Sequence, residues 1–284
     1  MENNEKNRVE GGVHYLVATP IGNLADITER AKKVLSEVNF IAAEDTRNTA
    51  RLLSCYNIKN ELLSYHEHNR RECGPKIVSR LLAGESAALV TDAGMPVISD
   101  PGEDIVALCA EAGVTVRIIP GCCAAVSALA LSALPSMRFC FEGFLPAVKG
   151  ERNKRLSALK NEERTMIFYE APHKLRATIS DMCEAFGEDR RISLCRELTK
   201  INEEALRITL GAAVKYYEER EPRGEYVLVV EGGAAEVTVD LSLSPEEQVA
   251  KYESEGMSRM DAIKKAAKER GMTKSELYKI LNKD

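Results

Sequence analysis

Short apolar runs alternate with amphipathic segments along most of the chain. Four runs rich in β-branched and aliphatic residues predict strands: HYLVAT from residue 14, NFIAA from 39, AALVT from 87 and VTVRII from 114. Between them, apolar residues at helical spacing predict helices over residues 28–37, 46–55, 72–82 and 104–111. This alternation favours an α/β domain with a largely parallel sheet. The segment AAVSALALS, after PGCC, predicts another helix, and because it is apolar on every side we expect it to be buried.

The alternation is interrupted at LPSMRFCFEGFLP, whose prolines indicate a linker near residue 135. It then resumes with strand-like TMIFY, RISLC, EEALRITLG and EYVLVVEG, and with helices expected over residues 151–160, 173–186 and 212–219. We therefore expect one α/β domain over residues 13–134 and a second over residues 135–232. The polar residues 1–12, of mixed charge, are expected to form a disordered tail.

The segment 243–284 predicts a small helical module. Ser244, Pro245 and Glu247 stand in the order of an N-cap, a first-turn proline and a capping-box acid. A second helix is expected from Arg259 to Arg270, and a third from Thr273. Residues 258–283 hold eight Lys or Arg against three Asp or Glu, which favours contact with phosphate groups. A packing or dimerisation module is the alternative.

Composition narrows the class of protein. The 284 residues contain no apolar run of the roughly 20 residues that span a bilayer. Eight cysteines without a CxxC pair indicate a reduced, cytoplasmic protein. His66 and His68 lie two residues apart with no third ligand in the sequence, so we expect no metal. The net charge of −5 gives no sign of nucleic-acid binding, but KGERNKRLSALK, residues 149–160, carries five basic residues that could face RNA.

Four loops follow predicted strands and carry unusual residues: TPIGN, AEDTR, TDAGMPVISDPG and PGCCA. Ligands of α/β sheets bind outside the carboxyl ends of strands, so these loops predict a binding site unless they are ordinary tight turns. Gly94 lets backbone approach a ligand closely, while Pro96 and Pro101 stiffen the longest loop. The chain has no GxGxxG after the first strand, no GxxxxGK[ST] and no GxSxG, which disfavours a Rossmann site, a P-loop and a nucleophile elbow.

These loops belong to a longer ordered series. LVATPIGNLADIT, IAAEDTRNTARLL, HEHN, LVTDAGMPVISDPG, PGCCAAVSAL, RFCFEGFLP, FYEAPHKL, RELTK and GEYVLVVEG follow one another between residues 13 and 232. The series closely resembles the ribosomal RNA small subunit methyltransferase I family, one of the tetrapyrrole-methylase-like (class III) methyltransferases. The resemblance implies two α/β domains of the tetrapyrrole methylase type, with a cleft for S-adenosylmethionine between them. It also implies a cytoplasmic homodimer that methylates the ribose 2′-oxygen of a cytidine in 16S rRNA of the small ribosomal subunit.

The resemblance also assigns site residues. The implied cofactor residues are Pro20, Ala93, Gly94, Met95, Pro96, Ile98, Cys123, Ala124, Tyr169, Glu170 and Thr199. Cys123 stands where the family commonly has a small hydroxyl residue, and Met95 replaces a frequent threonine. A side-chain contact from the Cys123 thiol is therefore weaker than that of a hydroxyl, whereas a backbone contact is unaffected.

Three residues are candidates for catalysis. Asp45 stands where related methylases place a functional aspartate, although an N-cap of the next helix is the alternative. Arg47 could hold an RNA phosphate, and Glu170 could contact the cofactor or accept a proton. Two other functions compete: a small-molecule tetrapyrrole methylase, and a non-catalytic RNA-binding assembly protein. The tetrapyrrole methylase is disfavoured by the motifs AEDTR and FYEAPHKL and by the helical tail. The assembly protein is distinguished by a measurement of methyl transfer, which it would not catalyse.

Overall fold

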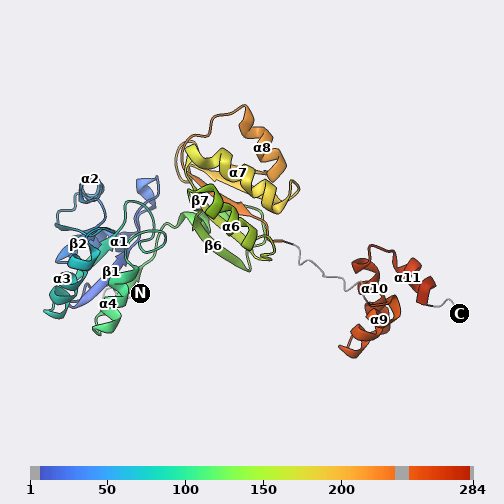
Figure 1. Cartoon of the computed structure of the whole chain (residues 1–284). Coiled ribbons are helices and arrows are strands. Elements are labelled where there is room, and N and C mark those ends of the chain that lie inside the picture. Colours follow the sequence, from blue (N-terminus) through green and yellow to red (C-terminus); the bar gives the residue numbers. More distant parts are fainter. Residues whose placement is uncertain (1–6, 234–242, 282–284) are drawn as a thin grey trace. The chain divides into compact units, whose positions relative to one another are not determined.

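The computed structural model describes residues 7–233 and 243–281. The chain divides into two compact units, one ending at Gly233 and the other beginning at Ala234. The first unit contains two five-stranded sheets with helices packed on them (Figure 1). Within the described residues, no helix is long and apolar enough to cross a membrane.

The first sheet is entirely parallel, as predicted. Its strands run in the order β3-β2-β4-β1-β5, and each neighbouring pair is parallel. They are β1 (Val13–Val17), β2 (Phe40–Ala43), β3 (Glu61–Ser64), β4 (Ala87–Val90) and β5 (Thr115–Ile119). The edge strand β3 was not predicted, because its residues ELLS show neither alternation nor a β-branched side chain. All five carboxyl ends meet at one edge of this sheet, which brings the four predicted loops together.

The helices of this half begin and end close to their predicted bounds. They are η1 (Leu24–Asp26), α1 (Glu29–Glu37), α2 (Thr46–Cys55), α3 (Arg70–Leu82), α4 (Glu103–Glu111) and α5 (Ala124–Leu131). The hydroxyl of Thr28 caps α1, and the carboxylate of Asp45 caps α2. The prediction that α5 is buried holds for one of its faces only. Its Ala128 and Leu129 are buried, but Val126 is 48% exposed, because the helix packs through one face only.

The two faces of the first sheet carry separate apolar layers, as alternation along a strand requires. Val13, Tyr15 and Val17 of β1 pack with α1, while Leu16 packs on the opposite face. His14 shares that opposite face and is fully buried, and neither ring nitrogen has a hydrogen-bond partner within the described residues. Burial lowers the pKa of His14 to about 4, because the charged imidazolium would lose its water there.

The second sheet is mixed and has the order β6-β7-β10-β8-β9. Only β6 and β7 are parallel; the other neighbouring pairs are antiparallel. The strands are β6 (Phe139–Phe144), β7 (Thr165–Glu170), β8 (Arg191–Arg196), β9 (Glu204–Thr209) and β10 (Tyr226–Val230). The helices are α6 (Lys149–Ala158), α7 (Pro172–Phe186) and α8 (Leu210–Glu218). The link between β8 and β9 has no helix, and such a short link joins antiparallel strands.

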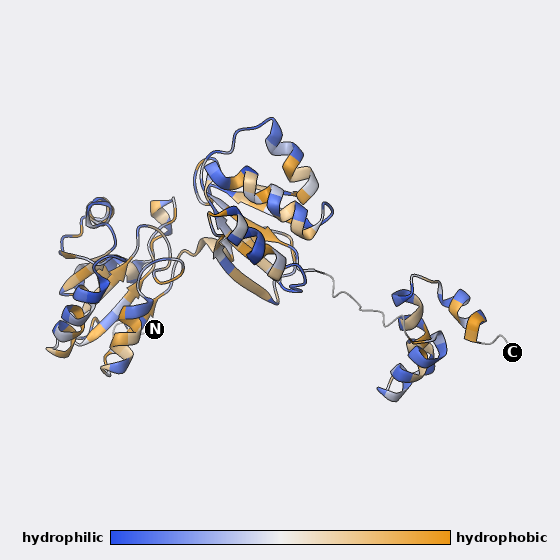
Figure 2. Ribbon diagram, in the orientation of Figure 1, coloured by the Kyte–Doolittle hydropathy of each residue, from blue (hydrophilic) through white to orange (hydrophobic). Residues whose placement is uncertain are grey.

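A buried ion pair corrects the prediction for the basic segment 149–160. Arg152 of α6 is only 8% exposed and its Nε donates to Asp181 across 2.7 Å. Arg155 pairs with Glu142. Arg152 therefore holds α6 against α7 and is not free for RNA, whereas the side chain of Arg155, although paired, remains half-exposed. Helices α6, α7 and α8 pack on one face of this sheet, and Figure 2 shows that they carry both hydrophilic and hydrophobic residues.

The expected disordered tail is only partly within the described residues. Residues 1–6 lie outside them. The expectation does not hold for the remainder, because the carboxylate of Glu10 forms an ion pair with Arg117 at 2.6 Å. The backbone N–H of Gly12 also donates to Glu85 at 2.8 Å. These contacts tie the residues before β1 to the first sheet.

The second unit contains α9 (Pro245–Ser254), α10 (Arg259–Glu269) and α11 (Lys274–Leu281) in its described part. Ser244 and Glu247 form the predicted capping box, and Gly271 adopts φ +65° after α10 as its predicted stop. The three helices share a small core of Val249, Ala262, Ile263, Ala266, Ala267 and Leu277. The helical module is thus an independent packing unit.

Candidate active site

The loops at the carboxyl edge of the first sheet are joined by backbone pairing. The backbone of Thr19 donates to Gly94 across 2.9 Å and accepts from it across 3.1 Å, so the loop after β1 is joined to the loop after β4. Beside this bridge lies a cavity of about 480 Å³. It is lined by both halves of the first unit: Ile21, Asp92–Met95, Ile98–Asp100, Cys123 and Ala124 on one side, and Phe144, Tyr169–Pro172, Cys195, Leu198 and Glu225–Val227 on the other.

The loop from residue 92 to 102 has an unusual backbone. Gly94 and Gly102 have φ values of +86° and +139°. Val97 and Ser99 also have positive φ, at 77° and 64°, although L-residues rarely adopt this conformation and a β-branched residue least of all. Such strain persists only where the surroundings enforce it, and it concentrates at functional sites. This explains the many turn residues after β4.

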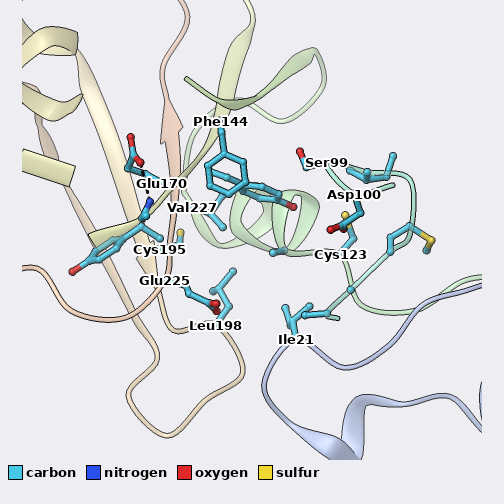
Figure 3. A pocket seen from close by; sticks show the side chains of 18 of the residues that line it. Ile21, Ser99, Asp100, Cys123, Phe144, Glu170, Cys195, Leu198, Glu225 and Val227 are labelled. Carbon is cyan, nitrogen blue, oxygen red and sulfur yellow. Dashed lines mark hydrogen bonds between the residues drawn. The ribbon is translucent and has the colours of Figure 1, made fainter. Parts of the chain in front are cut away.

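The second half supplies aromatic walls. The rings of Phe144 and Tyr169 meet edge to face with centroids 5.5 Å apart. Burial raises the pKa of Tyr169 to about 12, so its phenol stays protonated and can donate a hydrogen bond. Leu198 and Val227 add apolar surface opposite Ile21, as Figure 3 shows. The cavity thus has room and apolar walls for a flat, ligand-sized group.

Most of the expected cofactor residues line this cavity. They are Ala93, Gly94, Met95, Ile98, Cys123, Ala124, Tyr169 and Glu170. Pro20 and Pro96 do not line it; both are buried behind the loops they turn. Thr199 does not line it either; this residue lines a separate open groove with Gly22–Leu24, Glu197, Lys200 and Ile201.

The lining carries four carboxylates, Asp92, Asp100, Glu170 and Glu225, and no Lys, Arg or His. Three of them are engaged by partners. Asp92 accepts from the amide of Asn48 at 3.0 Å, and Glu225 pairs with Lys200 at 2.8 Å. Glu170 accepts from the N–H of Ala171 at 2.8 Å and from Thr178, which fixes it at the start of α7.

Asp100 is in a different environment. Its carboxyl is half-buried on the side of the cavity opposite Glu170 (Figure 3). Burial, with the nearby charges of Glu44 and Asp92, raises the pKa of Asp100 to about 6. Burial and Asp92 also raise the pKa of Glu44. The carboxyl of Asp100 therefore changes its protonation close to neutral pH.

The structure places Asp45 and Arg47 outside the cavity. Asp45 accepts from the N–H of Arg47 at 2.8 Å and pairs with its guanidinium at 2.8 Å. These bonds hold the pKa of Asp45 at about 2, which makes it a weak proton acceptor. The geometry gives Asp45 the N-cap role that the sequence offered as the alternative. Arg47 remains largely exposed, with 84% of its side chain open to solvent.

The sequence did not predict that Asp100, Ile21, Ser99, Phe144, Leu198, Glu225 and Tyr226 belong to the site. The position of Ile21, Ser99 and Asp100 within loops already selected was a usable signal. Nothing local marks Phe144 or Glu225, which reach the cavity only because the second half packs against the first. Among the described residues, no group of three or more His, Cys, Asp or Glu could hold a metal ion.

Comparisons with known proteins agree with this architecture. The family model of the tetrapyrrole (corrin/porphyrin) methylases matches residues 14–214. The chain is 45% identical to the ribosomal RNA small subunit methyltransferase I of Halalkalibacterium halodurans, over 98% of both chains. It is 46% identical to the protein of that name from Bacillus subtilis, over 94% of this chain and 93% of that one.

Solved structures show the same fold at low sequence identity. Diphthine synthase aligns with a TM-score of 0.58 and 13% identity, over 78% of this chain and 91% of that chain. Uroporphyrin-III-C-methyltransferase from Thermus thermophilus aligns with a TM-score of 0.54 and 18% identity, over 77% of this chain and 94% of that one.

Proposed function

Because the chain belongs to the ribosomal RNA small subunit methyltransferase I family, we propose that it methylates the ribose 2′-oxygen of a cytidine in 16S rRNA of the small ribosomal subunit. The methyl donor in this proposal is S-adenosylmethionine, bound in the cavity between the two halves of the first unit. The observation that carries the proposal is the composition of the cavity lining, which combines a strained glycine loop, aromatic walls and carboxylates.

The lining fits this donor. S-adenosylmethionine supplies a methyl group on a positively charged sulfonium, and its product is a neutral thioether. Four carboxylates without a cationic side chain favour the positively charged donor over that product. At about 480 Å³, the cavity lies within the usual range for small-molecule sites.

The role that we propose for each of these residues follows from its position relative to the cavity. Ala93, Gly94 and Met95 present backbone to the donor, with Ile98, Cys123 and Ala124 beside them. Tyr169 offers a hydroxyl and a ring from the other half. Glu170 shapes the wall by fixing the start of α7. Pro20, Pro96 and Thr199 support these loops from outside the cavity.

RNA contact is proposed for the exposed guanidinium of Arg47 and for the helical module. Arg47 is the neighbour of Asn48, which bonds to the cavity residue Asp92, so a phosphate held by Arg47 would lie near the reacting ribose. The basic excess of residues 258–283 would bind further phosphates. We include a cytoplasmic location and a homodimer in the proposal on the strength of the family.

Transfer of a labelled methyl group tests the function directly. The full chain is given tritiated S-adenosylmethionine with small ribosomal subunits lacking the modification, and in parallel with tetrapyrrole precursors. We expect label in 16S rRNA, at a ribose that resists alkaline cleavage, and none in the tetrapyrroles. Label in tetrapyrroles alone would assign a small-molecule methylase. Cofactor binding without transfer to either substrate would favour the non-catalytic assembly protein.

A further inference from the structure

Phe144 lines the cavity and is nevertheless largely open to solvent. It is 61% exposed, although its ring meets that of Tyr169 edge to face, with centroids 5.5 Å apart. Figure 3 shows the ring beside the cavity, with Glu170 on one side and Ser99 on the other. A single exposed apolar side chain is common on protein surfaces and by itself indicates nothing. What distinguishes Phe144 is the backbone that holds it.

A β-bulge in β6 sets the direction of Phe144. Successive side chains of a regular strand point to opposite faces, so residues three apart should lie on opposite faces of the sheet. The pairing of β6 with β7 shifts by one residue between Phe141 and Gly143, so that Phe141 lies opposite Ile167 and Phe144 lies opposite Tyr169. Both phenylalanine rings therefore contact the ring of Tyr169, at centroid distances of 5.1 and 5.5 Å.

The residues on either side of the bulge show the same change of direction. Cys140 and Leu145 both pack in the core on the helix-covered face, although a regular strand would place them on opposite faces. Without the extra residue, Phe144 would point into that core and away from Tyr169. Bulges are frequent next to active sites, where they change the direction of a side chain.

The bulge depends on Gly143. Its φ is +63°, a conformation that glycine adopts without a steric cost. An added Cβ would lie 3.3 Å from Oγ of Ser99, which itself has φ +64° in the loop after β4. Two segments of unusual backbone, one from each half of the first unit, thus meet next to Phe144. Because strained backbone concentrates at functional sites, this arrangement indicates that the direction of Phe144 serves the site.

The size of the cavity limits what the ring can contact. A cavity of about 480 Å³ holds a small molecule, and ligands of that size are mostly enclosed by their pocket. An RNA strand, with its chain of riboses and phosphates, is too large to enter. The reacting ribose therefore has to reach the methyl group from the mouth of the cavity, and its base stays outside, where Phe144 is exposed.

The chemistry of the side chain selects a base over the other parts of a nucleotide. Phenylalanine has no hydrogen-bonding atom, so it binds neither phosphate nor hydroxyl groups. Unpaired RNA bases, in contrast, stack on the flat faces of aromatic side chains. The edge-to-face contact with Tyr169 leaves a face of the Phe144 ring available for such a stack.

We propose that Phe144 is a substrate-binding residue on which the base of the methylated nucleotide stacks, so that the attached ribose is held at the mouth of the cavity. This proposal rests on the proposed function and deepens it. Stacking needs only the flat face of a base and tolerates any base. Phe144 thus positions the nucleotide and does not choose between cytosine and the other bases.

Substitution of Phe144 tests the stack in the full-length protein. Initial rates of methylation of small ribosomal subunits lacking the modification are compared for wild type, Phe144→Ala, Phe144→Leu and Phe144→Tyr. Phe144→Ala should lower kcat/KM for the subunits by about ten- to hundredfold, because the stack is lost. Phe144→Leu should resemble Phe144→Ala, because an aliphatic side chain does not stack. Phe144→Tyr keeps the ring and should stay within about twofold of wild type.

Phe139→Ala is the matched control. Phe139 is a second exposed phenylalanine of β6, at 40%, and does not line the cavity, so its replacement should leave kcat/KM unchanged. Affinity for S-adenosylmethionine, measured by calorimetry, should change less than about twofold in the Phe144 variants, because little of the exposed ring is buried by the cofactor. Equal kcat/KM in wild type and Phe144→Leu would show that the ring is only an apolar wall and would overturn the stack.

A second measurement uses the absence of tryptophan from the chain. Phe144→Trp carries the only tryptophan, whose emission is quenched when a base stacks on it. In the presence of the thioether product, a short oligoribonucleotide of cytidines should quench this emission, and a strand of the same length without bases should not. Both strands are added until the anisotropy of a labelled strand shows that binding is complete.

Each outcome of this titration has one meaning. Quenching by S-adenosylmethionine alone would assign the ring to the adenine of the cofactor and overturn the proposal. Absence of quenching by the cytidine strand, or equal quenching by the strand without bases, would overturn it as well. If wild type transfers no methyl group to RNA, the proposed function fails, while the quenching still decides whether a base stacks on the residue at position 144.

Discussion

Thr19 and Gly94 exchange two backbone hydrogen bonds, at 2.9 and 3.1 Å, and so connect the loop after the first strand to the strained loop that lines the cavity. The pairing holds Gly94 where a side chain does not fit. An added Cβ would lie 3.2 Å from Cγ2 of Ile21, and φ is already +86°.

Gly94→Val should therefore weaken binding of S-adenosylmethionine by at least about tenfold, because both the backbone conformation and the space oppose a side chain. Calorimetric titration of the folded variant measures the loss. Gly84→Val is the matched control: Gly84 has φ +94°, but a Cβ there meets nothing within 4 Å. It should cost stability without affecting binding. Equal affinity in Gly94→Val and wild type would make the loop purely structural.

Asp100→Asn should reduce affinity for the positively charged donor more than affinity for the neutral thioether product. The substitution removes one negative charge and nearly preserves shape. In wild type, donor affinity should fall as pH decreases through about 6, since the pKa of Asp100 is raised to that value and protonation removes its charge. Competition titrations with both ligands at pH 5, 6 and 8 measure this preference. The role assigned to Asp100 would be contradicted if wild type and Asp100→Asn had the same ratio of donor affinity to product affinity.

His14 should make the first sheet sensitive to acid. Its pKa is about 4 in the folded protein against an ordinary 6.5, so between these values the unfolded chain binds a proton that the folded chain does not. Stability is complete above pH 6.5 and decreases as pH falls toward 4, by about 3 kcal/mol at most. His14→Leu should remove this loss. Urea unfolding at pH 7, 5.5 and 4.5 gives the free energy of unfolding of wild type and His14→Leu. If this free energy depends on pH in the same way in both proteins, His14 is not the group responsible.

The buried ion pair of Arg152 and Asp181 should matter for stability and not for RNA. Arg152→Met leaves the buried Asp181 carboxylate with Lys149, 3.9 Å away, as its remaining ion-pair partner. This should lower the free energy of unfolding by about 3–5 kcal/mol. Arg152→Met combined with Asp181→Leu should recover much of that loss. Affinity for small subunits should stay constant in every variant that remains folded. A weaker affinity in the folded double variant would restore Arg152 to the RNA-binding surface.

Local signals made the helices predictable. Thr28, Asp45 and Ser244 each accept a backbone N–H of the turn they precede, and such caps depend on a few neighbouring residues only. The all-parallel first sheet was equally accessible, because parallel strands need long crossovers. The strand directions of the second sheet could not be predicted, since the alternation of strands and helices says little about which strands pair and in which direction.

The site likewise contains residues that the sequence could predict and residues that it could not. The backbone loop of Gly94 was found from its own residues, whereas the importance of Asp100 depends on burial and on Glu44, which lies far away in sequence. Arg152 shows the opposite error: its basic neighbours suggested a surface that could face RNA, but its partner Asp181 comes from α7. Burial and pairing between distant segments are set by packing, which no short stretch of sequence reports.

The register of Ala43 with Val90 and Ser64 also limits how this edge can change. Adding or deleting one residue within β2 or β4 would exchange the two faces of that strand and move Glu44 or Thr91 away from its neighbour. Strand lengths are thus fixed by the pairing of the sheet, and the loops that line the cavity share this constraint, because Thr19 and Gly94 tie two of them together. A designer who exchanges segments between relatives of this enzyme should therefore keep the number of residues in each strand and transfer the two bridged loops together.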